Sequence, residues 1–233
     1  MRLRAGLVIA VIAATLTATL AGCAAEEPAD VPAPTAEAPA EPSTDPVATW
    51  VNESGIALVT WGSSSLACTP TVADVQADGQ TLAVTFTEPP ADTMCTADFS
   101  PRATYIAVPK GVDPTRDMTV SFQGAGFQGR VPLEGNSALT GTPDERARSA
   151  SWFAPGGIVL LTWGSSTCPP VVQTIAEAKD GATVTFQTDA TRMCSRDLAP
   201  RLTVLDVTAP ADPAGYLLTL SGDSLDGTVE VLG

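Results

Sequence analysis

The chain has 233 residues and carries 26 acidic against 12 basic side chains, a formal charge of −14. Proteins hold nucleic acid by neutralising phosphates with Lys and Arg, so this charge disfavours nucleic acid as a partner, and it disfavours charge-driven binding to anionic lipid as well. The complete absence of His excludes Ser-His-Asp and Cys-His catalysis and every His-ligated metal site.

The first 23 residues have the layout of a secretory signal. Two arginines precede an uncharged apolar run, residues 5–22, that ends in small residues before a cysteine. Residues 20–23 (LAGC) resemble the lipobox of bacterial lipoproteins. This resemblance implies that residues 1–22 are a cleaved signal peptide and that Cys23 carries the lipid. The alternative is an uncleaved membrane-spanning helix, because the apolar run is just long enough to cross a bilayer.

A proline-rich and acidic segment follows the lipidation site. Residues 24–48 contain six prolines, six acids and neither an aromatic nor a basic residue. Such a composition cannot bury a core, so residues 23–48 are interpreted as the lipid anchor and a disordered tether with polyproline character. At ~3.1 Å per residue the tether reaches at most about 75 to 80 Å.

The rest of the chain is an internal duplication. Residues 49–133 and 151–233 repeat the same anchors in the same order, and a turn-rich linker, residues 134–150, separates them. The first copy carries Trp50, Trp61, Ser63, Ser64, Cys68, Cys95, Asp98 and Arg102, and the second carries Trp152, Trp163, Ser165, Ser166, Cys168, Cys194, Asp197 and Arg201. The sequence therefore predicts two domains of similar fold.

Nearly all local signals in both copies favour strands. Residues 56–61 form a short apolar run, as expected of a strand covered on both faces. Residues 81–87 alternate between apolar and polar, and the preceding Asp-Gly predicts a hairpin with a type I′ turn. Further strands are expected at residues 104–108, 119–122, 130–133, 202–207, 217–220 and 228–232. We predict an all-β protein with two tandem small antiparallel β-sandwich or barrel domains.

The remaining cysteines predict one disulfide in each copy. Four cysteines in an exported chain allow three pairings. The duplication selects Cys68 with Cys95 and Cys168 with Cys194, because equivalent positions should form equivalent bonds. The alternative is a metal site with four thiolate ligands, but the chain lacks a close C-x-x-C pair. No metal and no cofactor is predicted.

The repeated Trp-Gly-Ser-Ser turn is the first candidate for a binding site. An indole beside two hydroxyls could form a polar pocket or a platform for sugar stacking. The candidate residues are Trp61, Ser63 and Ser64 in the first copy and Trp163, Ser165 and Ser166 in the second. The favoured alternative is structural: each Trp would pack in the core with Trp50 or Trp152, and the serines would bond to turn backbone.

Two arginines and one tyrosine complete the set of candidate binding residues. Arg102 and Arg201 could each receive a carboxylate or phosphate from a ligand. We favour an internal ion pair instead, because an Asp precedes each Arg by four residues. Tyr105 stands where the second copy has Val204, and such differences between copies point to a surface that contacts a partner.

These features indicate a cellular location and a fold class rather than a biochemical activity. The whole chain resembles secreted lipoproteins of actinobacteria, in keeping with ten Arg against two Lys, and this resemblance carries no activity. We expect a non-enzymatic protein, anchored by lipid to the extracytoplasmic face of the cell membrane, that binds an envelope protein, peptide or glycan. The alternatives are a structural scaffold or spacer without a small ligand and, third, a carboxylate-dependent hydrolase, although no catalytic residue can be named.

Overall fold

The computed structural model describes residues 44–140 and 146–233. The signal segment, Cys23 and most of the tether lie outside these residues. The described residues belong to one compact unit that spans residues 42–233. They are all-β, as predicted, with strands, one short 3-10 helix and no α-helix. No helix among them is long and apolar enough to cross a membrane.

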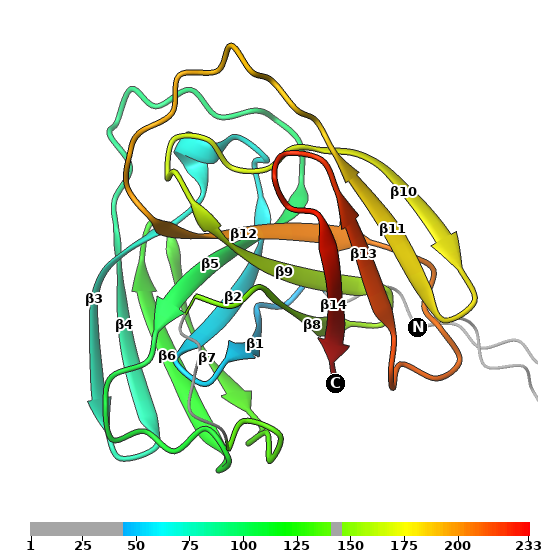
Figure 1. The fold of residues 1–233 in the computed structure, drawn as a ribbon. Helices are drawn as coiled ribbons and strands as arrows, with labels where there is room; N and C mark the ends of the chain where they lie inside the picture. The colour runs from blue at the N-terminus through cyan, green and yellow to red at the C-terminus, as the bar shows by residue number, and fades with distance from the viewer. Residues whose placement is uncertain (1–43, 141–145) are drawn as a thin grey trace, which may run out of the picture. The chain divides into compact units, whose positions relative to one another are not determined.

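Seven strands form each copy (Figure 1). The first copy contains β1 (Val47–Asn52), β2 (Gly55–Gly62), the 3-10 helix η1 (Leu66–Cys68), β3 (Thr71–Asp78), β4 (Thr81–Thr87), β5 (Ser100–Ala107), β6 (Met118–Gly124) and β7 (Phe127–Leu133). The second contains β8 (Ser149–Ala154), β9 (Gly157–Gly164), β10 (Val172–Ala178), β11 (Gly181–Phe186), β12 (Ala199–Asp206), β13 (Leu217–Ser221) and β14 (Gly227–Leu232).

The two copies share one pairing scheme. The first forms a three-stranded sheet, β1-β2-β5, and a four-stranded sheet, β3-β4-β6-β7. The second repeats both as β8-β9-β12 and β10-β11-β13-β14, but β14 also pairs in parallel with β8, which joins all seven strands into one sheet. The described residues thus form three sheets rather than two separate sandwiches or barrels.

The expectation of purely antiparallel sheets is wrong at one equivalent place in each copy. Strand β4 pairs in parallel with β6, and β11 pairs in parallel with β13. The intervening strand pairs elsewhere, β5 with β2 and β12 with β9, so the chain crosses over and returns beside the strand it left. Parallel neighbours need such a long crossover connection.

Each copy has its own apolar core. In the first copy the core cluster takes side chains from both sheets, including Ile56 and Leu58 of β2 and Leu82, Val84 and Phe86 of β4. The burial of β4 alternates along the strand, as expected for one buried face. The second copy forms the equivalent cluster from β8, β9 and β11 to β14.

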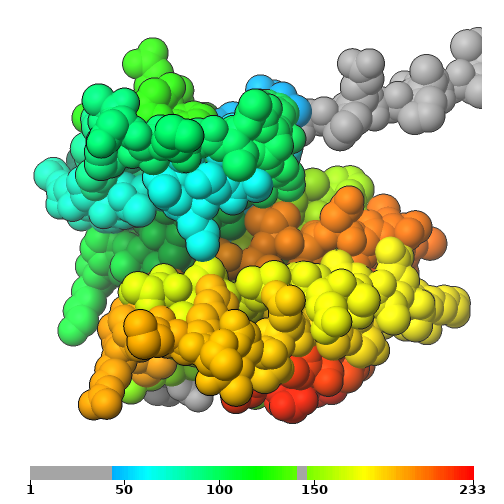
Figure 2. Space-filling model, turned by 90° about the horizontal axis from the view of Figure 1, so that it is seen from above, coloured from blue at the N-terminus to red at the C-terminus, as the bar shows by residue number. Residues whose placement is uncertain are grey.

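A third apolar cluster joins the copies. Ala57 and Val59 of β2 pack with Val159 and Leu161 of β9, and all four are fully buried. Figure 2 shows the two copies, blue to green and yellow to red, against one another. The two faces of β2 therefore serve different cores, one within the copy and one between copies. This confirms the expectation that residues 56–61 form a strand covered on both faces.

The expected hairpin forms in both copies, but not with the expected turn. In the first copy β3 and β4 close at Asp78 and Thr81, so Gly79 and Gln80 occupy the turn. In the second, Lys179 and Asp180 occupy it. Of these four residues only Gly79 has a positive φ, 57°, whereas a type I′ turn needs positive φ at both central positions.

Candidate functional site

The disulfides fasten equivalent loops in the two copies. Cys68 pairs with Cys95 and Cys168 with Cys194, as the duplication predicts. Each bond joins the loop after β2 or β9 to the loop before β5 or β12. We call these segments the disulfide loops: residues 63–70 and 88–99 in the first copy, and residues 165–171 and 187–198 in the second. Among the described residues no group of three His, Cys, Asp or Glu side chains could hold a metal ion.

An aspartate organises each Trp-Gly-Ser-Ser turn. Asp98 accepts hydrogen bonds from the Ser64 amide at 3.1 Å, from the Ser100 hydroxyl at 2.9 Å and from the Thr96 hydroxyl. The hydroxyl of Thr96 and the hydroxyl and amide of Ser64 hold the pKa of the Asp98 carboxyl well below its usual value. These bonds tie the two disulfide loops of the first copy together beside the disulfide.

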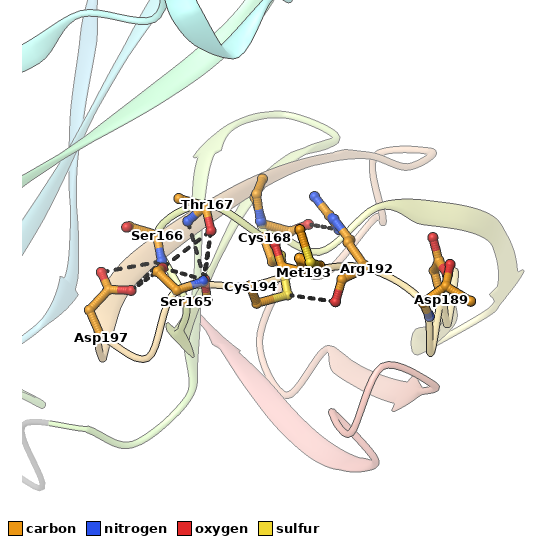
Figure 3. The surroundings of a disulfide bond; sticks show 12 residues. Ser165, Ser166, Thr167, Cys168, Asp189, Arg192, Met193, Cys194 and Asp197 are labelled. Atoms are coloured by element: carbon orange, nitrogen blue, oxygen red, sulfur yellow. Dashed lines mark hydrogen bonds between the residues drawn. A yellow bond between two sulfur atoms is a disulfide. The ribbon is translucent and has the colours of Figure 1, made fainter.

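The second copy repeats this arrangement (Figure 3). Asp197 accepts hydrogen bonds from the Ser166 amide at 3.2 Å and from the Ser195 hydroxyl. The hydroxyl of Ser195, followed by the hydroxyl and amide of Ser166, lowers the pKa of Asp197 to about 2. The carboxylate is therefore charged at neutral pH and is already occupied by donors of its own loops.

The arginines bond to the backbone carbonyls of the same turns. Arg102 Nη1 donates to the Cys68 carbonyl at 2.6 Å and to the Ser63 carbonyl at 3.3 Å. Arg201 donates to the Cys168 carbonyl at 2.9 Å and to the Trp163 carbonyl at 3.2 Å. These bonds commit the Nη1 group of each guanidinium to the turn backbone, which makes a ligand site at either arginine less suitable.

The expected ion pairs between Asp98 and Arg102 and between Asp197 and Arg201 are wrong. Neither aspartate forms an ion pair within 4 Å of its arginine, whereas Lys179 and Asp180 do form one at 3.9 Å. Aspartate and arginine instead hydrogen-bond to different groups of the same turn: the carboxylate accepts from amides and hydroxyls, and the guanidinium donates to carbonyls.

The glycine of the turn makes room for the arginine. A side chain on Gly62 would place its Cβ 2.7 Å from Arg102 Cζ, and one on Gly164 would place it 2.6 Å from Arg201 Cζ. Each guanidinium therefore lies against a residue without a side chain. The repeated Trp-Gly-Ser-Ser pattern thus has a structural explanation in both copies.

The hydroxyls of the two turns are also used internally. Ser63 Oγ bonds to Thr96 Oγ1 at 2.7 Å and accepts from the Ser65 amide at 3.2 Å. Ser165 Oγ bonds to Ser195 Oγ at 2.7 Å. The structural interpretation of these serines is therefore the better supported one.

The two turn tryptophans lie between the copies rather than in the copy cores. Trp61 packs edge-to-face against Phe153 at 6.5 Å between ring centroids, and Trp163 packs against Tyr105 at 6.1 Å. Trp61 follows Ala57 and Val59 at every second position, so it shares their face, toward the other copy. The expectation that Trp61 packs with Trp50 is therefore wrong.

The other two tryptophans pack inside the copies. Trp50 is buried in the first core and donates from Nε1 to the Glu134 carbonyl at 2.9 Å. Trp152 packs edge-to-face against Tyr216 at 5.2 Å. The expected pairing of Trp163 with Trp152 is wrong for the same reason as in the first copy.

The packing of the second copy on the first explains why residue 105 is a tyrosine. Its ring contacts Trp163, and its hydroxyl donates to the Ser54 carbonyl at 3.4 Å. Gly55 leaves space for this ring, because a Cβ there would lie 2.3 Å from it. The substitution of Tyr105 by Val204 between the copies therefore reflects their mutual packing.

A set of exposed apolar side chains escaped the sequence analysis. Met94 is 89% exposed and Phe99 67% in the first copy, and the equivalent Met193 and Leu198 are 94% and 52% exposed in the second. Leu66 of η1 is 67% exposed beside the first disulfide. We call these five residues the apolar tips. Their signal was present in the repeated Met-Cys pair and in the apolar residue that follows each Asp.

The apolar tips all lie on the disulfide loops. These loops are gathered at one end of the described strands, at the top of Figure 1 and facing the viewer in Figure 2. Each disulfide therefore presents exposed apolar groups on a loop whose backbone is fixed by a covalent bond and by the aspartate network.

A cleft of about 660 Å³ lies between β1, the segment after β7 and the end of the second copy. Its wall includes Trp50, Phe153 and one acidic side chain, Glu134. A glycosidase needs two carboxylates that face one another, and this cleft does not provide that pair.

The comparisons with known proteins assign no relative. No protein-family model matches the chain, no curated protein matches it, and no solved structure matches it.

Proposed function

We propose that this chain is a lipid-anchored protein of the cell envelope, without enzymatic activity, whose duplicated β copies bind a protein or peptide through the disulfide loops. The observation that carries the proposal is the exposure of Met94 and Met193, with Phe99 and Leu198, at equivalent places in the two copies. Exposed apolar groups gathered on one surface are typical of sites of protein interaction.

The chemistry of the apolar tips suits a protein surface. Methionine has three rotatable bonds and a polarisable thioether, so it adapts to irregular apolar partners. The disulfides and the aspartate networks fix the loop backbone before a partner arrives, which reduces the conformational entropy lost on binding. Two equivalent loops add avidity if one partner engages both.

A glycan is a less suitable ligand for this surface. Sugar platforms use the face of an exposed aromatic ring, but Trp61 and Trp163 are half-buried between the copies and Trp50 is buried. Among the described residues the large exposed aromatic side chain is Phe99, which lacks a polar group to orient a sugar hydroxyl.

The anchor is supported by residues 20–23 and by the acidic, proline-rich segment that follows them. It is tested by Cys23→Ala, which should prevent lipid labelling and release the protein or leave it unprocessed. Normal lipid labelling of this variant would refute the anchor without affecting the binding proposal.

The binding site is tested by affinity capture from an envelope extract with residues 24–233, the mature chain without the lipidated Cys23. We expect a retained protein that the double variant Met94→Asp, Met193→Asp holds at least about tenfold more weakly, because each Asp places a charge in an apolar contact. Leu217→Asp is the matched control, since Leu217 is 47% exposed on β13, outside the disulfide loops.

Two results would contradict this proposal. Equal retention by the double variant and the Leu217→Asp control would show that the apolar tips do not make the contact. Retention of nothing, including glycans on a panel, would favour the alternative of a structural scaffold.

A further inference from the structure

The methionines divide sharply by exposure. The sequence contains four, of which Met1 lies outside the described residues. Met94 and Met193 are 89% and 94% exposed, whereas Met118 of β6 is 4% exposed in the first core. A thioether reacts with a dissolved oxidant only where the oxidant can reach it, so two of the three described methionines are open to solvent and the third is shielded.

The exposed thioethers are also the reactive sulfur atoms of this surface. All four cysteines of the described part are in disulfides, so none supplies a thiolate to intercept an oxidant. Met94 directly precedes Cys95, and Met193 directly precedes Cys194. Figure 3 shows Met193 on the loop that the second disulfide fastens.

We infer that Met94 and Met193 form a paired modification site, at which a peroxide or a hypohalous acid converts each thioether to a sulfoxide. A lone pair of Sδ attacks one oxygen of hydrogen peroxide, the O–O bond breaks, and water leaves after proton transfer. The sulfur loses two electrons and the peroxide gains them. With a hypohalous acid the halide and a proton leave instead. Methionine sulfoxide is polar and is reduced back by sulfoxide reductases.

The modification leaves the scaffold unchanged but alters the surface. Neither side chain contributes to the three apolar clusters of the described residues, so a sulfoxide there costs no core packing. It places a polar group at the most exposed apolar tip of each copy. If the disulfide loops bind a protein, oxidation weakens both contacts together; this consequence rests on the proposed function, whereas the modification itself does not.

The reaction is tested on the folded mature chain with hydrogen peroxide, followed by peptide mapping. We expect Met94 and Met193 to gain one oxygen at rates within about threefold of one another and at least about tenfold faster than Met118. Addition of a denaturant should remove the difference, because unfolding exposes Met118. Equal rates for all three in the folded protein, or protection of either loop methionine, would overturn the inference.

The effect on binding is tested with the same oxidised sample in the capture assay. We expect at least about tenfold weaker retention after oxidation and recovery after treatment with reductases specific for the two sulfoxide epimers. The double variant Met94→Leu, Met193→Leu should retain as much partner after peroxide treatment as before it, whatever the amount retained before treatment. Oxidation without loss of retention would refute the regulatory effect and leave the modification standing, whereas an untreated protein that retains nothing would refute the proposed function.

Discussion

The two copies differ most at the seam between their first and last strands. In the second copy β14 pairs with β8, with Val231 opposite Ala150 and Leu232 opposite Ser151. In the first copy β7 and β1 are not paired, and the 660 Å³ cleft lies beside them. A duplicated fold can therefore keep every internal pairing of a copy and still differ in whether its edges close.

The chain after β7 bonds to a distant segment of the first copy. The Gly135 amide donates to Asp117 at 3.0 Å, and the Asn136 amide donates to the Pro114 carbonyl at 2.8 Å. These bonds fasten the chain after β7 to the β5–β6 connection. The Glu134 carbonyl accepts from the Trp50 indole, so a side-chain bond holds the first copy where backbone pairing holds the second.

The contact between the copies is also unequal in its side chains. Each turn tryptophan packs against an aromatic ring of the other copy, but the partners, Phe153 and Tyr105, come from positions that are not equivalent. Val51 stands in the first copy where Phe153 stands in the second, and Val204 stands where Tyr105 does. The copies are therefore complementary and not interchangeable.

The largest expected effect tests whether the two disulfides stabilise their copies equally. Replacing both cysteines of one disulfide by Ser should lower the free energy of unfolding by about 3.5 kcal/mol, because the loop closures span 27 and 26 residues and cost similar chain entropy. Denaturant titrations of Cys68→Ser, Cys95→Ser and of Cys168→Ser, Cys194→Ser measure this. A much smaller loss in one copy would break the equivalence.

A second prediction concerns the equivalent glycines Gly124 and Gly222. Their φ angles are 104° and 87°, and a Cβ on either would lie 2.5 Å from a carbonyl oxygen of Phe86 or Phe186. Substitution by Ala should cost about 1–3 kcal/mol through strain and more through the clash. Gly126→Ala is the control, with φ 77° and open space; a control as destabilised as Gly124→Ala would contradict the clash.

A smaller effect on stability should distinguish the equivalent positions 105 and 204 of the two copies. Tyr105→Val should lose about 1 kcal/mol with the edge-to-face contact to Trp163, whereas Val204→Tyr should gain nothing, because Trp61 already has Phe153. Tyr105→Phe keeps the ring and removes the hydroxyl, which donates to the Ser54 carbonyl. The contact of the ring would be unimportant if unfolding titrations gave Tyr105→Phe a lower free energy of unfolding than Tyr105→Val.

The smallest effect is a dependence on pH. The native pKa of Asp197 is lowered to about 2 from 3.8, and that of Asp98 is lowered further. The stabilising effect is therefore fully present above the unfolded value of 3.8 and is lost as the pH falls toward the native pKa. Melting temperatures of wild type, Asp98→Asn and Asp197→Asn should differ at pH 7 and converge toward pH 2; a constant difference would exclude these carboxylates as the source.

Much of this protein can be read from its sequence. The repeated anchors determined the duplication and the cysteine pairing, because equivalent positions in a repeated fold make equivalent bonds. The apolar run of residues 56–61 determined that β2 is buried on both faces, since a strand with one exposed face alternates.

The candidate site shows where such local reasoning ends. Asp and Arg four residues apart suggest an ion pair, but each bonds to the backbone of the strand-end turn instead: Asp98 accepts from an amide, and Arg102 donates to carbonyls. Trp61 and Tyr105 are conspicuous along the chain, yet only the packing of one copy on the other assigns them to the interface between copies.

The tertiary structure alone decided which side chains remain at the surface. The sequence places Met94 and Met193, but not Met118, before a cysteine without showing which of the three is exposed, whereas the fold buries Met118 in a core and leaves the other two in solvent. It also decided which seam closes, because the pairing of β14 with β8 joins residues that are far apart in the chain. Burial and long-range bonding depend on contacts between residues far apart in the chain, so local patterns do not encode them.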